Sequence, residues 1–291
     1  MPALIDLRRR IRSVRNTQQI TKAMKTVSTA KFKKAQRIVL GKRPYWQSYL
    51  DLLEKVVSWA ERNCRLLLEE RKENKMEAVV MASDKGLCGA FNANLLEEAF
   101  SFFEKKAHEE VRLVLIGRKV MSFFKNKSFP VDRKYMGNVD ELTGEELKDL
   151  AQYLMKLYVF NRTDAVYIIC NKFKSILAPK IIIKRLIPIE PSEMLEDKEG
   201  DEEQLLPDWE PGKEILLDSL LPFYVENQIR RLFMESLAAE HAARMMAMDS
   251  ATRNAEDLIE ELTKVLNKVR QASITKELLE IMTAVDALSK K

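Results

Sequence analysis

The stretch that decides the fold is FYVENQIRRLFMESLAAEHAARMMAMDSATRNAEDLIEELTKVLNKVRQASITKELLEIMTAVDALSKK, residues 223–291. It contains neither glycine nor proline over 69 residues, so nothing in it breaks a helix. As one helix it is roughly 100 Å long. That length exceeds the width of an ordinary globular domain, and a long isolated helix needs a partner for stability. We therefore expect a second helix to pack along it.

Apolar residues along this stretch follow a heptad repeat. Their spacing is 3, 4, 3, 4, 3, 4, 3, which is typical of a coiled coil. Alanine occupies three of the positions and permits close approach of the partner helix. The stripe is formed by Met248, Ala251, Ala255, Leu258, Leu262, Val265, Val269 and Ala272.

The N-terminal region supplies a partner. Residues 3–40 also lack glycine and proline, and an apolar stripe begins at Leu4, Leu7, Ile11 and Val14. The register then slips, and we expect the stripe to continue at Ile20, Met24 and Val27. Two long terminal helices around a compact middle predict an antiparallel coiled coil. The alternative is that each helix packs separately in an ordinary bundle.

The middle of the chain reads as an α/β domain with a mainly parallel, Rossmann-like sheet. A helix is expected over 140–160, with Thr143 as its N-cap and Glu146 completing a capping box. Strands are expected at residues 78–82, 111–116, 165–170 and 180–189.

These patterns divide the chain into four parts. Residues 1–75 form the N-terminal helix of the coiled coil, and residues 76–190 form the central domain. Residues 191–214 are rich in acids and contain Pro191, Pro207 and Pro211, which is typical of an exposed linker. Residues 215–291 form the C-terminal helix.

Charge is unevenly distributed. Residues 1–43 contain 13 Lys and Arg and one acid, Asp6, giving +12, and because the whole chain carries +5 the remainder carries −7. A basic arm on a mildly acidic body predicts an acidic partner, which includes nucleic acid, anionic lipid or an acidic protein surface. Against nucleic acid, no aromatic residue precedes Phe32, so base stacking has no platform.

Signals for catalysis, cofactors and metals are weak. The run SDKGLCG at 83–89 follows a strand, but it matches neither dinucleotide nor phosphate-loop fingerprints, so a plain turn is favoured. Cys64, Cys88 and Cys170 show no metal-binding spacing and are expected to be reduced thiols. With His108 and His241 as the only histidines, we expect no catalytic thiol, metal site or cofactor. No signal peptide or membrane span is expected.

Three ordered motifs carry a resemblance to a known family. They are RRIRSVRNTQQITKAMKTVSTAKFKKAQ at 9–36, SDKGLCGAFN at 83–92, and ESLAAEHAARMMAMDSATRNAEDLIEELTKVLNKVRQASITKELLEI at 235–281. Together they resemble the γ subunits of F-type ATP synthases. Thr26, Thr29 and Ala90 depart from the family's usual Met, Ala and Gly, which are small packing changes.

This resemblance implies a non-catalytic rotor shaft. Its partners are the hexamer of α and β subunits, the ε subunit and the c-ring, on the cytoplasmic face of a bacterial plasma membrane that it meets only through the complex. The motif match and the basic arm assign partner contacts to Arg8, Arg9, Arg12, Lys22, Met24, Lys25, Arg270, Gln271, Thr275 and Glu277.

Two competing hypotheses stay open from the residues alone. The first is a basic coiled coil that binds nucleic acid, which rests on the N-terminal charge and predicts salt-dependent binding to duplex DNA. The second is an α/β enzyme with a helical oligomerisation stalk, which rests on the turn after the first strand and predicts turnover or tight nucleotide binding by the isolated chain.

Overall fold

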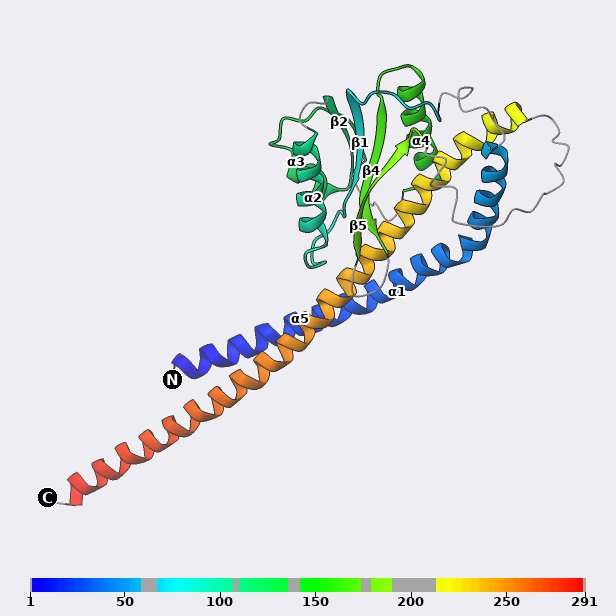
Figure 1. Cartoon of the computed structure of the whole chain (residues 1–291). Helices are drawn as coiled ribbons and strands as arrows, with labels where there is room; N and C mark the ends of the chain where they lie inside the picture. The colour runs from blue at the N-terminus through cyan, green and yellow to red at the C-terminus, as the bar shows by residue number, and fades with distance from the viewer. Residues whose placement is uncertain are drawn as a thin grey trace. The chain divides into compact units, whose positions relative to one another are not determined.

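The computed structural model describes residues 2–58, 67–106, 110–135, 142–173, 179–189 and 213–289. Its contacts divide the chain into two compact units. One comprises Met1–Thr29 together with Arg244–Lys291, and the other is Ala30–Ala243. Two long helices, α1 (Pro2–Ser58) and α5 (Lys213–Ser289), contribute residues to both units (Figure 1).

The unit Ala30–Ala243 is built on a five-stranded sheet in the order β3-β2-β1-β4-β5. The strands β1 (Lys75–Met81), β2 (Glu110–Ile116), β3 (Val131–Tyr135) and β4 (Ala165–Lys172) pair in parallel, and only β5 (Lys180–Ile187) is antiparallel. The predicted mainly parallel sheet is confirmed. Near-continuous burial of β1 and β2 is expected of strands that are covered on both faces.

Helices cover the two faces of the sheet (Figure 1). On one face, Met76, Ala78 and Val80 of β1 pack with α2 (Phe91–Lys105) and α3 (Arg118–Phe124). On the other, the alternate residues Val79 and Met81 pack with α4 (Gly144–Val159) and α5. The alternation follows from the two-residue period of a strand.

Helix α4 begins where its sequence predicts. The Thr143 side chain accepts a hydrogen bond from the Glu146 N–H, and the Glu146 carboxylate accepts one from the Thr143 N–H. This reciprocal pair is the predicted capping box. Strand β3 and the short helix α3 were not predicted. Strand β3 is only five residues long and its sequence VDRKY lacks an apolar alternation, and α3 has only seven residues.

The terminal helices differ in detail from their predicted limits. Helix α1 has 57 residues and includes Pro44, and its course bends in the half that belongs to this unit (Figure 1), as a proline within a helix requires. Helix α5 has 77 residues and includes Pro222. The acidic linker lies largely in 190–212, outside the described residues, as do Cys64 and His108. The four-part division remains a proposal.

The SDKGLCG turn is closed by the side chain of Asn92, at the start of α2. Asn92 Oδ1 accepts a hydrogen bond from the Ser83 N–H at 3.1 Å, and Asn92 Nδ2 donates to Cys88 Sγ at 3.1 Å. Gly117, at φ +100°, packs against this turn, and a Cβ there would lie 2.1 Å from the Ala82 carbonyl oxygen. Cys88 and Cys170 are buried and belong to no disulfide, as predicted for reduced thiols.

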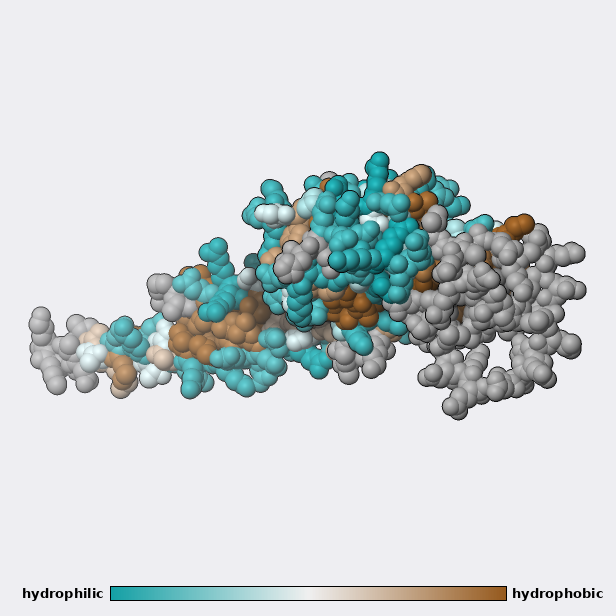
Figure 2. Space-filling model, turned by 45° about the horizontal axis from the view of Figure 1, so that its top comes forward, coloured by the Kyte–Doolittle hydropathy of each residue, from teal (hydrophilic) through white to brown (hydrophobic). Residues whose placement is uncertain are grey.

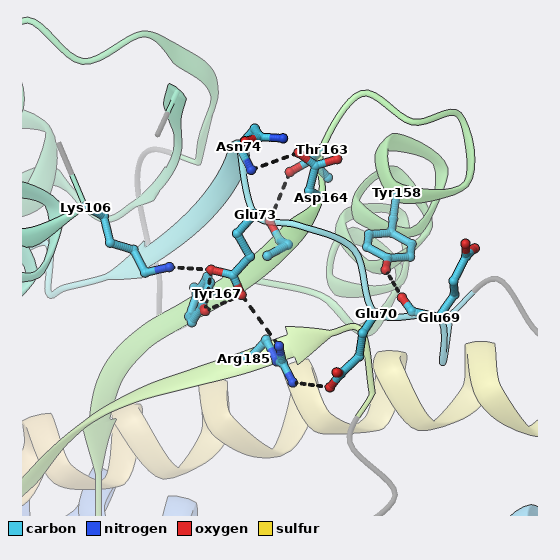
Figure 3. Close-up of polar contacts among 11 residues, drawn as sticks. Glu69, Glu70, Glu73, Asn74, Lys106, Tyr158, Thr163, Asp164, Tyr167 and Arg185 are labelled. Atoms are coloured by element: carbon cyan, nitrogen blue, oxygen red, sulfur yellow. Dashed lines mark hydrogen bonds and ion pairs between the residues drawn. The ribbon is translucent and has the colours of Figure 1, made fainter. Parts of the chain in front are cut away.

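The segment that leads into β1 is fastened by ion pairs and hydrogen bonds (Figure 3). The Glu73 carboxylate contacts the Lys106 ammonium, accepts a hydrogen bond from Tyr167 Oη at 2.9 Å, and lies 3.5 Å from Arg185. Burial acts to raise the pKa of Glu73, but hydrogen bonds from Lys106 and Tyr167 outweigh it and hold this pKa below its usual value. The carboxylate therefore joins α2, β4 and β5 as a charged group.

Candidate partner-binding surface

The unit formed by Met1–Thr29 and Arg244–Lys291 is an antiparallel pair of helices (Figure 1). The Oγ1 atoms of Thr21 on α1 and Thr252 on α5 lie 2.8 Å apart, in hydrogen-bond contact. Buried side chains of α5, among them Met248, Ala255 and Leu262, occupy the predicted heptad positions. The predicted antiparallel coiled coil is confirmed, and the separate-bundle alternative is wrong.

The seam of α1 continues through polar residues. The inward positions begin at Leu4, Leu7, Ile11 and Val14. The same alternating spacing of 3 and 4 then continues through four polar residues, which are Gln18, Thr21, Lys25 and Ser28. The predicted continuation at Ile20, Met24 and Val27 is wrong, because Ile20 is 61% exposed and Val27 is 57% exposed. The heptad never slips; instead, polar side chains occupy the core positions, a choice that weakens a coiled coil while fixing its register.

A charge cluster holds the centre of this unit. The Lys25 ammonium lies 2.5 Å from one carboxylate oxygen of Asp249, and Arg253 contacts the other oxygen from one helical turn further on. The hydrogen bonds from Lys25 and Arg253 lower the pKa of Asp249. One carboxylate is therefore shared by two cations, so the cluster keeps one positive charge and Lys25 meets any partner already paired.

An outward apolar stripe accompanies this cluster. Ile20, Met24 and Val27 are spaced 4 and 3, so they share one face of α1. Ile20 and Val27 on this face are exposed, and Met24 between them is partly buried. Figure 2 shows brown surface on the paired helices, bordered by teal polar side chains. Apolar side chains gathered on a solvent-facing surface indicate a binding site for another protein. Of these three residues, only Met24 was assigned a partner contact from the sequence.

The end of α5 extends beyond α1 (Figure 1). The Thr21 and Lys25 contacts fix a register that places Pro2 level with about residue 271, at equal rise along both helices. Every described side chain from Ile274 to Val285 is exposed. The large apolar ones are Ile274, Leu278, Leu279, Ile281, Met282 and Val285. A helix of this composition without a neighbour among the described residues needs cover from another chain.

The ten residues assigned to partner contacts all belong to this unit, but they do not form one cluster. Arg8, Arg9, Arg12 and Lys22 are exposed, and Met24 and Lys25 are partly buried. Arg270, Gln271, Thr275 and Glu277 are exposed on α5, roughly 30 Å along the helix from Asp249.

Local hydrogen bonds order the α5 group of these residues. Thr275 Oγ1 donates to the Gln271 carbonyl oxygen at 3.0 Å, and Ser273 Oγ donates to the Glu277 carboxylate at 3.2 Å. The unit therefore offers one surface beside Lys25 and another near the end of α5.

We also searched the described residues for metal sites and for helices that could cross a membrane. His241 is 5% exposed, and no group of three or more metal-ligating side chains occurs among the residues the structure covers. Among the described helices, none combines the length and the apolar character needed to cross a membrane.

Comparisons with a family model and with known proteins all identify the same family. A family model described as ATP synthase matches residues 3–288. The ATP synthase gamma chain of Pelotomaculum thermopropionicum is 40% identical over 288 residues, covering 99% of this chain and all of the relative. That of Solibacter usitatus is 41% identical over 296 residues, covering 99% of both chains.

Solved structures share the fold. A chain from the Euglena gracilis mitochondrial ATP synthase OSCP/F1/c-ring structure aligns with a TM-score of 0.67 at 18% identity, covering 99% of this chain and 95% of that one. A chain from the central stalk/c-ring structure of Tetrahymena thermophila aligns with a TM-score of 0.59 at 22% identity, covering 80% and 99%. With a family model and full-length relatives in agreement, this chain belongs to the ATP synthase gamma chain family.

Proposed function

We propose that the chain is the central rotor shaft of an F-type ATP synthase. It transmits torque from a proton-driven c-ring to a hexamer of α and β subunits, with the ε subunit as a further partner. ATP chemistry takes place on β, so the chain is not an enzyme by itself. It joins the cytoplasmic face of a bacterial plasma membrane only through the complex.

The observation that carries this proposal is the end of α5. Six large apolar side chains between Ile274 and Val285 are exposed on the part of α5 that extends beyond the end of α1. The end of a rotor shaft that is surrounded by other subunits has this composition, because those subunits supply the missing apolar contacts. Gamma chains of 40% identity extend over the same full length, which supports the assignment.

The charged surface fits a part that must move against its bearing. Arg8, Arg9 and Arg12 are exposed and form no ion pair within the described residues. Ion pairs between exposed groups contribute about 0–1 kcal/mol each. Contacts of that size to acidic loops of β can break and re-form at every step without locking the shaft.

Reconstitution tests the proposal. The purified chain is mixed with α and β subunits, and the assembly and the rate of ATP hydrolysis are measured. We expect one copy per hexamer and a rate well above that of α and β alone. A chain that stays unassembled with subunits of its own source contradicts the proposal.

Coupling provides a second readout. Replacing Arg270 and Gln271 together by alanine removes two exposed side chains near the end of α5, and we expect fewer protons pumped per ATP in inverted vesicles. The matched control replaces Glu260 and Lys264 by alanine, because this exposed pair lies on the same helix and its loss changes no net charge. Unchanged pumping per ATP in the R270A/Q271A complex contradicts the contact assignment.

A further inference from the structure

A cleft opens in the unit Ala30–Ala243, which we call the α/β unit, beside the amino ends of β2 and β3. Its volume is about 700 Å³. Phe103 of α2, which is 1% exposed, lies at its base, and Phe100, Phe123 and Phe129 line it as partly buried side chains. The cleft is therefore lined by aromatic rings from two helices and from the segment that precedes β3.

Three of these rings are arranged as the sides of a box. The centroids of Phe100 and Phe123 are 6.3 Å apart at an interplanar angle of 78°, and those of Phe100 and Phe129 are 6.4 Å apart at 89°. Each ring thus stands nearly perpendicular to Phe100. Perpendicular aromatic faces carry negative potential and bind cations such as ammonium groups.

An ammonium group of the chain itself already occupies this box. Lys127 Nζ lies 3.3 Å from the centroid of Phe100 and 4.9 Å from that of Phe123. The backbone N–H of Lys127 donates to the Phe124 carbonyl oxygen at 3.1 Å, in the turn that ends α3. This turn places the lysine where its side chain reaches back over the rings.

The rim of the cleft adds negative charge. Glu104 at the end of α2 and Glu110 at the start of β2 both line it and are both exposed. Glu110 lies 3.5 Å from Arg112, whereas Glu104 forms no ion pair within the described residues. Two carboxylates that line the same cleft as the aromatic rings favour a cationic ligand over an anionic or neutral one.

We propose that this cleft binds a lysine side chain of a neighbouring protein, and that Lys127 is its internal occupant until the incoming ammonium displaces it. The ligand class follows from the group that is already present: an ammonium on an alkyl stem, held over Phe100 in a cleft that two acidic side chains also line. The site lies on the α/β unit and does not depend on the contacts proposed for the coiled coil.

A side-chain analogue tests the site in the full chain. The chain is labelled with ¹³C-phenylalanine and titrated with n-butylammonium, and 1-butanol serves as the neutral control of the same length. We expect K127A to bind n-butylammonium at least tenfold more tightly than the wild-type chain, because the competing ammonium is gone. Shifts of the Phe100 and Phe123 signals report the binding.

Further variants keep the test decisive. K127M retains an apolar stem without charge, so it replaces K127A if the alanine variant loses stability, and the same gain is expected. E104Q/E110Q in the K127A background should weaken n-butylammonium binding severalfold, while K105A, an exposed lysine of α2 outside the cleft, should change nothing. Equal binding by wild-type and K127A chains, or equal shifts with 1-butanol, overturns the proposal.

The partner is tested in the assembled ATP synthase. A photoreactive benzoylphenylalanine at position 100 keeps an aromatic ring in the cleft and crosslinks whatever enters it. We expect a crosslink to a peptide of another subunit beside a lysine. Crosslinks confined to this chain, or to a partner surface without a lysine, contradict a lysine of a neighbouring protein as the ligand.

Discussion

Lys25 of α1 and Asp249 of α5 form an ion pair of 2.5 Å across the coiled coil. Lys25 occupies a heptad position that an apolar residue would fill in a strongly stabilised coiled coil. The neighbouring seam residues Thr21 and Ser28 are polar as well, and both are buried. This part of the pair is therefore held in register by specific polar contacts, with less apolar burial than the flanking turns.

Replacing Asp249 by asparagine should lower the melting temperature of the chain at pH 7, because two cations lose their shared carboxylate. Since Lys25 and Arg253 lower the pKa of Asp249, the carboxylate stabilises the fold above its unfolded pKa, and this contribution is lost as the pH falls through the folded pKa. The difference between wild type and D249N should therefore shrink below about pH 4. Thermal unfolding followed by circular dichroism measures it.

High salt should also reduce this difference, because the ion pair is partly exposed. E260Q is the control, since Glu260 pairs with Lys264 on one exposed helix face and bridges no helices. A D249N variant that melts like E260Q would show that the contact between α1 and α5 adds nothing.

Replacing Glu77 by glutamine should stabilise the α/β unit at neutral and alkaline pH. Glu77 is 1% exposed on β1, and burial, together with the nearby Asp132 carboxylate, raises its pKa to about 8 although Arg112 opposes the shift. Tyr153 of α4 lies near the Glu77 carboxyl group as well, and its hydroxyl donates a hydrogen bond to the Asp132 carboxylate at 3.1 Å. The folded chain thus keeps a proton on Glu77 that the unfolded chain releases.

The direction of the pH dependence follows from these two pKa values. Between about pH 4.3, the ordinary pKa of glutamate, and pH 8, the unfolded state binds fewer protons than the native state. The free energy of unfolding should fall across this window, by at most about 1.4 kcal/mol per pH unit. Urea denaturation of wild type and E77Q at pH 5 and pH 8 checks this, with the exposed E97Q as control. Parallel pH profiles for wild type and E77Q would contradict the assignment.

Replacing Thr143 by alanine should destabilise the α/β unit by about 1 kcal/mol, because the N-cap hydrogen bond to the Glu146 N–H is lost. T143S keeps the hydroxyl and should restore most of the stability. Urea denaturation is the measurement. A T143A variant as stable as T143S would mean that water replaces the cap without cost.

The elements that were predicted correctly carry strong local signals. The capping box at Thr143, the buried strand runs and the helices without glycine or proline each depend on neighbouring residues alone. The missed elements lack such signals: β3 owes its place to pairing with β2, a contact between residues distant in sequence. The outward stripe at Ile20 and Val27 was misplaced because apolar residues were assumed to face inward, and a surface made for another protein reverses that rule.

The exposed end of α5 gives the last prediction. Leu278 and Met282 lie one helical turn apart and are 57% and 68% exposed. Replacing both by serine should leave the isolated chain within about 0.5 kcal/mol of wild type, because both side chains are exposed in the described part of the chain. In the complex each should become buried, and burial of a leucine or methionine contributes about 1.5–3 kcal/mol. Binding to α and β subunits should therefore weaken at least tenfold.

Titration of the chain into α and β subunits, followed by the rise in ATP hydrolysis, measures this affinity. The matched control replaces Lys276 and Glu280 by serine, because these exposed residues flank the same turn and form an ion pair with each other. A loss confined to L278S/M282S would show that the apolar face of the tip is bound by the hexamer. Equal affinity of the two variants would mean that α5 beyond Ala272 projects into solvent in the complex, and the apolar tip would then need another explanation.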